Sequence, residues 1–437
     1  NGKLVAMEAD WTIDHGPYCE FGDLLTMRGT QFIGAGYDIP NSRGVGRTVA
    51  TNHAWGSAFR AYGAPQSLFA TEVLADMMAE KIGMDPLEFR YLNVYREGST
   101  TPTGCPPDVI AFPQALDTLR PLYKEAKERA KEKNKKGGNI KYGVGISLNM
   151  YGCGLDGADS SEVWIELTKD GVTLGASWED HGQGADMGAL THTYESLRPL
   201  GIKPENIKLV LNDMTKTPNS GPSGGSRQNV VTGNAIQAAC RNLLDAMRKP
   251  DGTYRTYDEM VKENLPLRYE GKWTAPNTAC DVDTGQGNPF STYMYGVIMS
   301  EVAVDTTTGK TTVEKMTIVS DCGTIINKPV VEGQIYGGLA QGIGLALKED
   351  FEDLKKHTTL TGCGIVEIQD VPDDIVIIHQ GTPRPHGPFG AAGVGEMPLS
   401  APHASIINAI YDACGVRITH LPAYPEKVLA GLKKLNK

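Results

Sequence analysis

The chain has 437 residues and a net charge of −10, from 42 basic and 52 acidic side chains. This length allows two or three domains that each bury a core, and the acidic balance gives no basic surface, so we expect no nucleic-acid partner. The most apolar long stretch, residues 330–347, contains Glu332, Gln334 and Gln341, which argues against a membrane span.

The cysteines and the start of the chain indicate a reducing compartment and a processed or split polypeptide. The eight cysteines include no CxxC pair, so we expect no zinc or iron–sulfur site built by this chain alone. We find no signal peptide, and reduced thiols in the cytoplasm are the simplest interpretation, with a periplasmic location left open. The sequence begins at Asn1, inside a predicted strand, which suggests a processed or split polypeptide.

The first part of the chain combines predicted strands with two predicted helices. Residues 1–50 show short alternating runs between turn signals, which predict strands, for example at 3–9 and 31–34. From residue 66 onward, apolar side chains recur at steps of three and four. This spacing predicts a helix that ends at Gly83 and a second helix over 87–95.

A domain boundary is predicted in the region that follows. A stretch rich in proline, glycine and threonine, residues 98–107, precedes a charged helix over 113–134. We interpret its charge run as a solvent-facing surface with pairs one turn apart. A glycine pair then breaks the helix. The predicted units are residues 1–110 and 139–437, joined by a helical connection at 111–138.

The second unit alternates predicted strands with predicted helices. The strands are at 163–167, 171–178, 207–212, 294–304 and 311–319, and the helices at 190–197, 231–247, 331–349 and 402–414. No repeat of fixed period is present. The predicted fold class is α+β with mixed sheets.

Glycine is the unusual residue, because 51 of the 437 positions are glycine, about 12% against a usual ~7%. Four clusters combine it with amide, hydroxyl or carboxylate side chains: 178–186, 219–228, 333–344 and 387–396. Such loops can direct backbone N–H groups at anionic oxygens, especially before a helix. One such loop is more often a plain turn, and neither a phosphate-loop nor a dinucleotide-binding signature is present. Four together favour a large multi-phosphate or polycyclic cofactor.

Glu396 is the sharpest candidate for chemistry. It follows Gly395 in apolar, charge-poor sequence. A poorly solvated carboxylate has a raised pKa, which suits a general base near neutral pH. The alternative is an acidic residue at the start of a following helix, and residue type alone does not separate the two.

Four segments resemble motifs of the molybdenum hydroxylase family, which includes xanthine dehydrogenases and aldehyde oxidoreductases. Residues 58–66 resemble its FRGxGxPQ segment, 181–184 its GQG loop, 224–228 its SGGSRQ loop and 393–396 its GxGE motif. The motifs stand in the family's order. The resemblance covers essentially the whole chain, corresponds to the C-terminal half of a molybdenum-binding polypeptide, and is strongest to the aldehyde oxidoreductases of sulfate-reducing bacteria.

The resemblance implies a fold and a cofactor. Residues 1–110 would be the C-terminal part of a first molybdopterin-binding domain, and 139–437 a second such domain that carries the catalytic glutamate. The cofactor would be molybdopterin cytosine dinucleotide with molybdenum, or with tungsten in its place. The pterin dithiolene would hold the metal, so no side chain of this chain would be a metal ligand.

The resemblance also implies the roles of individual residues. Glu396 would take a proton from a molybdenum-bound water or hydroxide, hydride would pass to a sulfido ligand, and Gln183 would hydrogen-bond an apical oxo ligand. The implied cofactor-binding residues are Phe59, Arg60, His181, Gly182, Gly184, Gly224, Gly225, Ser226, Arg227, Gln228, Gly338, Gln341, Gly393, Val394 and Gly395.

The implied substrate leaves alternatives open. Phe21, Leu24 and Tyr62 match the apolar funnel of aldehyde oxidoreductases, although the same residue types also suit an ordinary core. Arg28 falls near the position of a substrate-binding arginine in purine hydroxylases, so hydroxylation of purines or other N-heteroaromatics is the alternative activity. A non-catalytic cofactor-binding or assembly subunit, and a plain binding protein with glycine-rich turns, are the alternatives from other classes.

Two departures from the family predict partners. The chain lacks the cysteine spacings of the family's [2Fe–2S] domains and the upstream Gly-Gly-Phe-Gly segment. We therefore expect a partner chain, or a missing region, that carries the N-terminal molybdopterin domain and the [2Fe–2S] clusters. A flavin subunit, a flavodoxin or a ferredoxin would then accept the electrons, within a higher oligomer.

Overall fold

The computed structural model describes residues 1–18 and 20–435. Near the start of the chain, strands β1 (Met7–Asp14) and β2 (Ser42–Val49) form a two-stranded parallel sheet. Helix α1 (Gly22–Gln31) crosses between them and packs on one face. Gly46 permits this close packing, because a Cβ there would lie within 3 Å of Thr26 and Thr30.

Three helices follow in the chain; the first packs against α1, and the second contacts the other two. They are α2 (Ala64–Lys81), α3 (Pro86–Asn93) and α4 (Phe112–Lys135). Asp85 caps α3 by accepting hydrogen bonds from the N–H groups of the second and third helical residues, at 2.8 and 3.2 Å.

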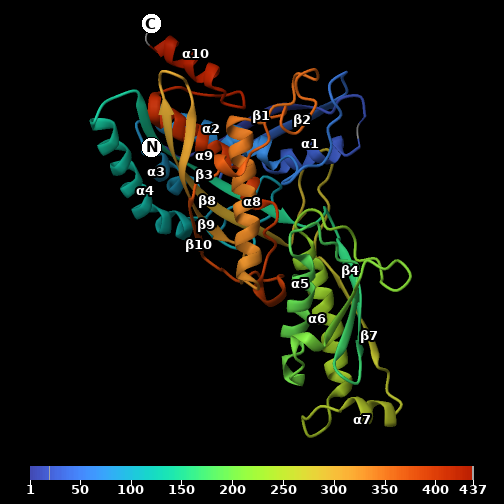
Figure 1. Ribbon diagram of the computed structural model, residues 1–437. Helices are drawn as coiled ribbons and strands as arrows, with labels where there is room; N and C mark the ends of the chain where they lie inside the picture. Colours follow the sequence, from blue (N-terminus) through green and yellow to red (C-terminus); the bar gives the residue numbers. More distant parts are fainter. Residues whose placement is uncertain (19, 436–437) are drawn as a thin grey trace.

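A four-stranded sheet in the order β10–β9–β8–β3 forms the centre of the larger lobe (Figure 1). Its strands are β3 (Ile140–Cys153), β8 (Thr292–Asp305), β9 (Thr311–Asp321) and β10 (Asp374–His379). Helix α9 (Pro402–Cys414) lies directly on β3. Gly143 and Gly145 allow this approach, because a Cβ at either would lie 2.2 Å from a carbonyl oxygen of α9. Helix α8 (Lys328–Leu347) packs beside α9, and α10 (Pro425–Leu435) follows α9 in the chain.

The second lobe has its own sheet and core, and Figure 1 shows it projecting from the first. The sheet runs β6–β5–β4–β7, with strands β4 (Ser160–Leu167), β5 (Val172–Ala176), β6 (Ile207–Leu211) and β7 (Arg268–Thr274). Helices α5 (Ala185–Ser196) and α6 (Gln228–Met247) pack on it, and α7 (Tyr257–Lys262) lies near its tip.

The two hydrophobic cores group the chain in a way that the predicted boundaries do not describe. One core joins residues of the first hundred positions to the sheet and helices after residue 290. The other lies within residues 163–260. The boundaries at 110 and 139 therefore remain predictions. The second lobe consists of the elements inserted in the chain between β3 and β8.

The structure corrects several predicted elements. The strand at 31–34 is wrong, because Gln31 ends helix α1 and the next residues form turns. The first strand begins at Met7 and not at residue 3, because Asn93 instead binds the backbone of Gly2 and Leu4. Strands β3, β7 and β10 and helices α7 and α10 were not predicted. No helix among residues 1–18 and 20–435 is long and apolar enough to cross a membrane.

Candidate active site

A cavity of about 1130 Å³ lies between the two lobes and is lined by residues of all four glycine clusters. Its lining comes from residues 21–62, 151–229, 322–341 and 391–396, which lie far apart in the sequence. The amino-terminal ends of α5, α6 and α8 all contribute, through Gly184, Gln228 and Asn327. Free N–H groups and the positive ends of helix dipoles suit anionic ligands.

Glu396 lies in this cavity, and its carboxylate is held by two distant segments. Oε1 accepts a hydrogen bond from the backbone N–H of Ala61 at 3.2 Å, and Oε2 accepts one from the hydroxyl of Ser226 at 2.8 Å. The Ser226 hydroxyl also lies 3.1 Å from the backbone nitrogen of Glu396. The residue precedes a short 3₁₀ helix, Met397–Leu399, but makes no side-chain capping bond to it. The Glu396 side chain therefore binds two distant segments and not the backbone of the helix that follows it.

The surroundings of Glu396 raise the pKa of its carboxyl above the ordinary value. Burial is the largest cause. The hydrogen bond from Ser226 and the charge of Arg28 act in the opposite direction, as do smaller contributions from Ala61 and Tyr151. A raised pKa makes an ionised carboxylate a stronger proton acceptor.

Behind Glu396, Arg28 and Tyr151 form a buried polar group. The Arg28 guanidinium lies 3.5 Å from the Tyr151 hydroxyl and 3.2 Å from the carboxylate of Asp156. It also lies over the ring of Phe290, 4.4 Å from the centroid. Arg28 thus lines the cavity, but its guanidinium is paired with Asp156.

Arg60 connects the segment of Ala61 to the loop of Glu396. Its Nε donates to the carbonyl of Gly395, and its two terminal nitrogens donate to Gln341 Oε1 at 2.9 Å and to the carbonyl of Gln334 at 2.8 Å. Burial lowers the pKa of Arg60 to about 10, and the nearby charge of Glu396 partly offsets this effect. Gln341, predicted to bind cofactor, therefore also positions Arg60.

The loop that carries Glu396 is anchored in the core. The backbone N–H of Ala392 donates to the carbonyl of Cys322 at 2.8 Å. Asn229, in the first turn of α6, donates to the carbonyl of Ala392 at 2.7 Å. The buried thiol of Cys153 lies 3.2 Å from the backbone nitrogen of Gly393. These contacts hold residues 391–396 between the two lobes.

Within the SGGSRQ loop, the charged side chain faces away from the cavity. Arg227 is 1% exposed and binds both carboxylate oxygens of Asp159, at distances from 2.7 to 3.0 Å. Gln228 donates to the carbonyl of Gly221 at 3.2 Å. The cavity therefore meets mainly the backbone of Gly224, Gly225 and Ser226, and a Cβ at Gly224 would meet no atom within 4 Å.

The GQG loop forms another wall of the cavity. Gln183 donates to the carbonyl of Glu179 at 2.9 Å and accepts a hydrogen bond from the backbone of His181. Asp180 accepts from the backbone nitrogens of Gly182 and Gly184, at 2.7 and 3.3 Å. Gln183, His181 and Gly184 line the cavity, whereas Gly182 is exposed beside it.

The predicted substrate residues surround the mouth of the same cavity. Phe21, Leu24 and Tyr62 line it together with Phe59. Their exposed fractions are 41% for Phe21, 51% for Leu24 and 58% for Phe59, so an apolar surface faces the opening. The ordinary-core alternative does not apply to Phe21 and Leu24, whereas Tyr62 is half-buried.

One predicted residue does not reach the cavity. A Cβ at Gly338 would lie 2.4 Å from Pro398, so this glycine serves the packing of α8 against the segment before α9. The other predicted residues line the cavity or lie directly beside it. Tyr151 and Asn229 were missed, although a tyrosine at the carboxyl end of a buried strand and an amide directly after a glycine loop were available signals.

The cavity fits a molybdopterin cofactor in size and chemistry. It presents bare glycine backbone, three helix amino-termini and amide side chains to its interior. No group of three or more His, Cys, Asp or Glu side chains able to hold a metal occurs within the described ranges 1–18 and 20–435. Glycine backbone, helix amino-termini and amide side chains are groups that hold an anionic organic cofactor through hydrogen bonds.

Comparisons with known proteins agree with this geometry. Two family models, each described as a molybdopterin cofactor-binding domain, match residues 118–372 and 1–94. The aldehyde oxidoreductase of Megalodesulfovibrio gigas is 60% identical over 435 residues, which are 99% of this chain and 48% of that protein. The xanthine dehydrogenase/oxidase of Gallus gallus is 28% identical over 94% of this chain and 31% of that protein.

The crystal structure of the aldehyde oxidoreductase from Desulfovibrio desulfuricans has the same fold, with a TM-score of 0.96 and 63% identity. The match covers 98% of this chain and 47% of that chain. The chain thus spans about half the length of the aldehyde oxidoreductases that it matches. These matches confirm the predicted resemblance and the predicted fold class. The chain belongs to the family of molybdopterin cofactor-binding domains, among relatives that include aldehyde oxidoreductases and xanthine dehydrogenases.

Proposed function

We propose that this chain is the catalytic portion of a molybdenum-dependent aldehyde oxidoreductase. The observation that supports the proposal is Glu396, a carboxylate with a raised pKa that opens into a cavity lined by glycine backbone. The overall conversion is of an aldehyde and water to a carboxylic acid, two protons and two electrons. When bound, the molybdenum cofactor supplies the two-electron chemistry.

The residues of this chain bind, orient and move a proton. Glu396 accepts a proton from the water whose oxygen enters the product, and Ser226 and Ala61 hold its two oxygens in place. The backbone of residues 224–226 and the Gln183 side chain bind the anionic face of the cofactor. Phe21, Leu24, Phe59 and Tyr62 bind the apolar part of an aldehyde and exclude water from it.

Hydroxylation of an N-heteroaromatic ring is the second candidate activity, because Arg28 lines the same cavity. The ion pair between Arg28 and Asp156 occupies this guanidinium, which favours the aldehyde. Benzaldehyde, xanthine and nicotinate provide the test. We expect turnover of benzaldehyde to be at least ten times faster than turnover of xanthine or nicotinate. The reason is that the polar groups of these two substrates would lack a hydrogen-bond partner in the cavity. Faster turnover of xanthine would reverse the assignment.

The cofactor form and the partners complete the proposal. We infer molybdopterin cytosine dinucleotide, [2Fe–2S] clusters on the polypeptide that supplies the other half, and a cytoplasmic location. Elemental analysis of the purified enzyme, release of the pterin dinucleotide and identification of each co-purifying chain test these points. Absence of both molybdenum and tungsten from an enzyme that turns over benzaldehyde would overturn the proposal.

A further inference from the structure

The sheet of β1 and β2 is the least complete element of the described structure. It has two parallel strands and no third one, among the residues that the structure describes. Purely parallel sheets occur almost only where both faces are covered, and two strands alone are marginally stable. The inward side chains of β1 are only half-buried, whereas β3 is buried continuously from Gly143 to Cys153.

One edge of β1 presents unpaired backbone groups. The N–H groups of Met7 and His15 donate to the residue before β2, Asn41 O at 2.9 Å, and to the last residue of β2, Val49 O at 3.0 Å. Because the backbone alternates, the odd-numbered residues of β1 face β2. The even-numbered residues, Glu8, Asp10, Thr12 and Asp14, therefore direct their N–H and C=O groups to the opposite edge.

The edge of β1 lacks the usual protection against strand pairing. Native edges are blunted by proline, charged side chains (especially lysine), bulges or very short strands. The sequence of β1, MEADWTID, has no proline, lysine or glycine, and it pairs with β2 in regular register over eight residues. Of its three carboxylates, Glu8 and Asp10 are neutralised by ion pairs with Arg43 and Arg47 of β2. An unprotected edge of this length is typical of a strand that is covered in the assembled protein.

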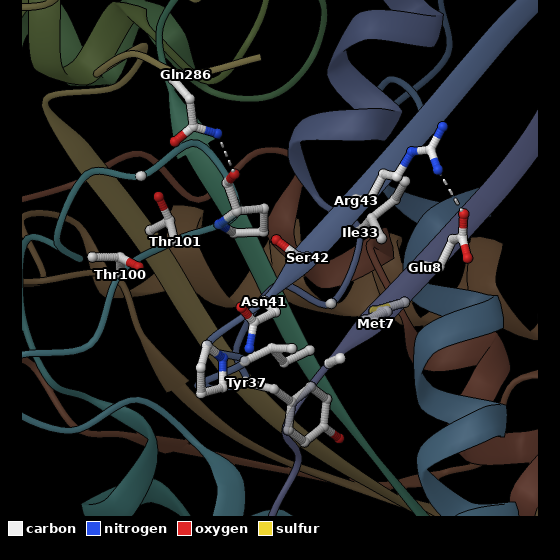
Figure 2. Close-up of a pocket in the computed structure, with 16 residues that line it drawn as sticks. Met7, Glu8, Ile33, Tyr37, Asn41, Ser42, Arg43, Thr100, Thr101 and Gln286 are labelled. Carbon is white, nitrogen blue, oxygen red and sulfur yellow. Dashed lines mark hydrogen bonds and ion pairs between the residues drawn. The ribbon is translucent and has the colours of Figure 1, made fainter. Parts of the chain in front are cut away.

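The other sides of this sheet are already occupied or suited to solvent. Helix α1 covers the inner face. The outer face carries exposed ion pairs, Glu8 with Arg43 at 3.2 Å and Asp10 with Arg47. At the amino-terminal end of β2, the loop of Thr100 and Thr101 lies across a cavity of about 540 Å³ (Figure 2). The outer edges of β1 and β2 are therefore both open, and β1, which has no glycine, is a better template for strand pairing than β2, which contains Gly44 and Gly46.

We propose that the outer edge of β1 pairs with an extended segment of the polypeptide that supplies the other half of the enzyme. The occupant is argued from length, because this chain spans only 48% of its Megalodesulfovibrio relative. The added strand would turn the β1–β2 pair into a three-stranded sheet and satisfy the outward groups of Glu8, Asp10, Thr12 and Asp14. The proposal rests on the proposed function only in assuming that this other half exists.

Hydrogen exchange at single-residue resolution, in the purified holoenzyme, tests the proposal. We expect the amides of Glu8, Asp10 and Thr12 to exchange about 100-fold or more slowly than the outward amides of β2, Ser42 and Gly44. Equally fast exchange at both edges would overturn the proposal. Molybdenum content and benzaldehyde turnover of the same sample report on the function separately, so an active enzyme with an unprotected β1 edge rejects only the pairing.

A pair of variants gives a second test. Thr12→Pro removes the outward N–H, whereas Thr12→Ala removes only an exposed side chain. We expect the proline variant to lose protection at Glu8 and Asp10 by at least ten-fold, and the alanine variant to keep it. Unchanged protection in a folded Thr12→Pro enzyme would contradict the pairing. If Thr12→Pro does not fold, the comparison of the two edges in the unmodified enzyme decides.

Discussion

The two walls of the cavity are built in opposite ways. On one wall, Glu396 is held by Ala61 and Ser226, which are 335 and 170 residues away in the sequence. On the other wall, Gln183 binds groups only two and four residues away, and much of its loop is exposed. The first wall is therefore fixed by contacts across the whole chain. On the second, the Gln183 side chain is held within its own turn, which Glu179 connects to Ser223.

This difference separates proton transfer from cofactor binding. A base must be positioned within a fraction of an ångström, and contacts from two lobes provide this precision. A loop that binds a large ligand can instead be completed by that ligand and by the missing half of the enzyme. Substitutions in the first wall should thus change turnover and its pH dependence. Substitutions in the second wall should have smaller effects on kcat and leave the pH dependence unchanged.

The largest effect is expected for Glu396→Gln. The amide oxygen can still accept the hydrogen bond of the Ala61 N–H, and the amide nitrogen can donate to the Ser226 hydroxyl, but the amide cannot take up a proton. We expect turnover of benzaldehyde to fall by about 10³-fold or more, with molybdenum and pterin content unchanged. Glu349→Gln is the matched control, because burial also raises the pKa of Glu349 but this residue does not line the cavity. Residual turnover above a tenth of normal would remove Glu396 from the proposed role.

Ser226→Ala should have the next largest effect, visible mainly in the pH profile. The Ser226 hydroxyl lowers the pKa of Glu396. Without it the pKa rises further, so the carboxylate protonates at higher pH and the acid limb of kcat/KM moves to higher pH. Near neutral pH we expect turnover to fall about 10-fold, on the scale of a hydrogen bond to a charged group. Ser223→Ala, on the side of Glu179, should leave the limb in place.

Much of the fold was predictable because its helices have regular apolar spacing. The helices α2, α4, α6 and α9 agree with the predicted ranges to within a few residues. Helix α1 was read as strand, since its buried face includes Thr26, Arg28 and Gln31, which hide the apolar period. Strand β3 was missed for a similar reason. The glycines that allow α9 to approach it also interrupt its run of apolar residues.

The candidate site was predictable where it is a motif and not where it depends on distant contacts. The four glycine clusters identified the cavity walls. Their composition did not show which glycines face the cavity: Gly224 faces open space, whereas Gly338 packs against Pro398. Glu396 could have been a helix-start acid. Only its bonds to Ala61 and Ser226, across hundreds of residues, separate the two interpretations.

Gln183→Ala tests the second wall. Its hydrogen bonds are local, so we expect the free energy of unfolding to change by less than about 0.5 kcal/mol. The proposed contact with the cofactor should be lost, and kcat should fall about 5-fold with the pH limb unmoved. Urea unfolding and a pH profile measure both quantities. A shift of the acid limb would show that the two walls are coupled, contrary to the comparison. Gln369→Ala, at an exposed position outside the cavity, is the control.

The smallest effect is expected at the mouth of the cavity, which belongs to neither wall. Leu24 is 51% exposed and lines the opening. Its truncation in Leu24→Ala removes apolar contact area without touching Glu396, so KM for benzaldehyde should rise about 3-fold while kcat stays within two-fold. Leu74→Ala is the matched control, because Leu74 is similarly exposed on α2 but lies outside the cavity. If Leu24 binds substrate, KM must rise in Leu24→Ala and stay unchanged in Leu74→Ala. A fall in kcat with KM unchanged would instead mean that Leu24 orients the aldehyde towards Glu396.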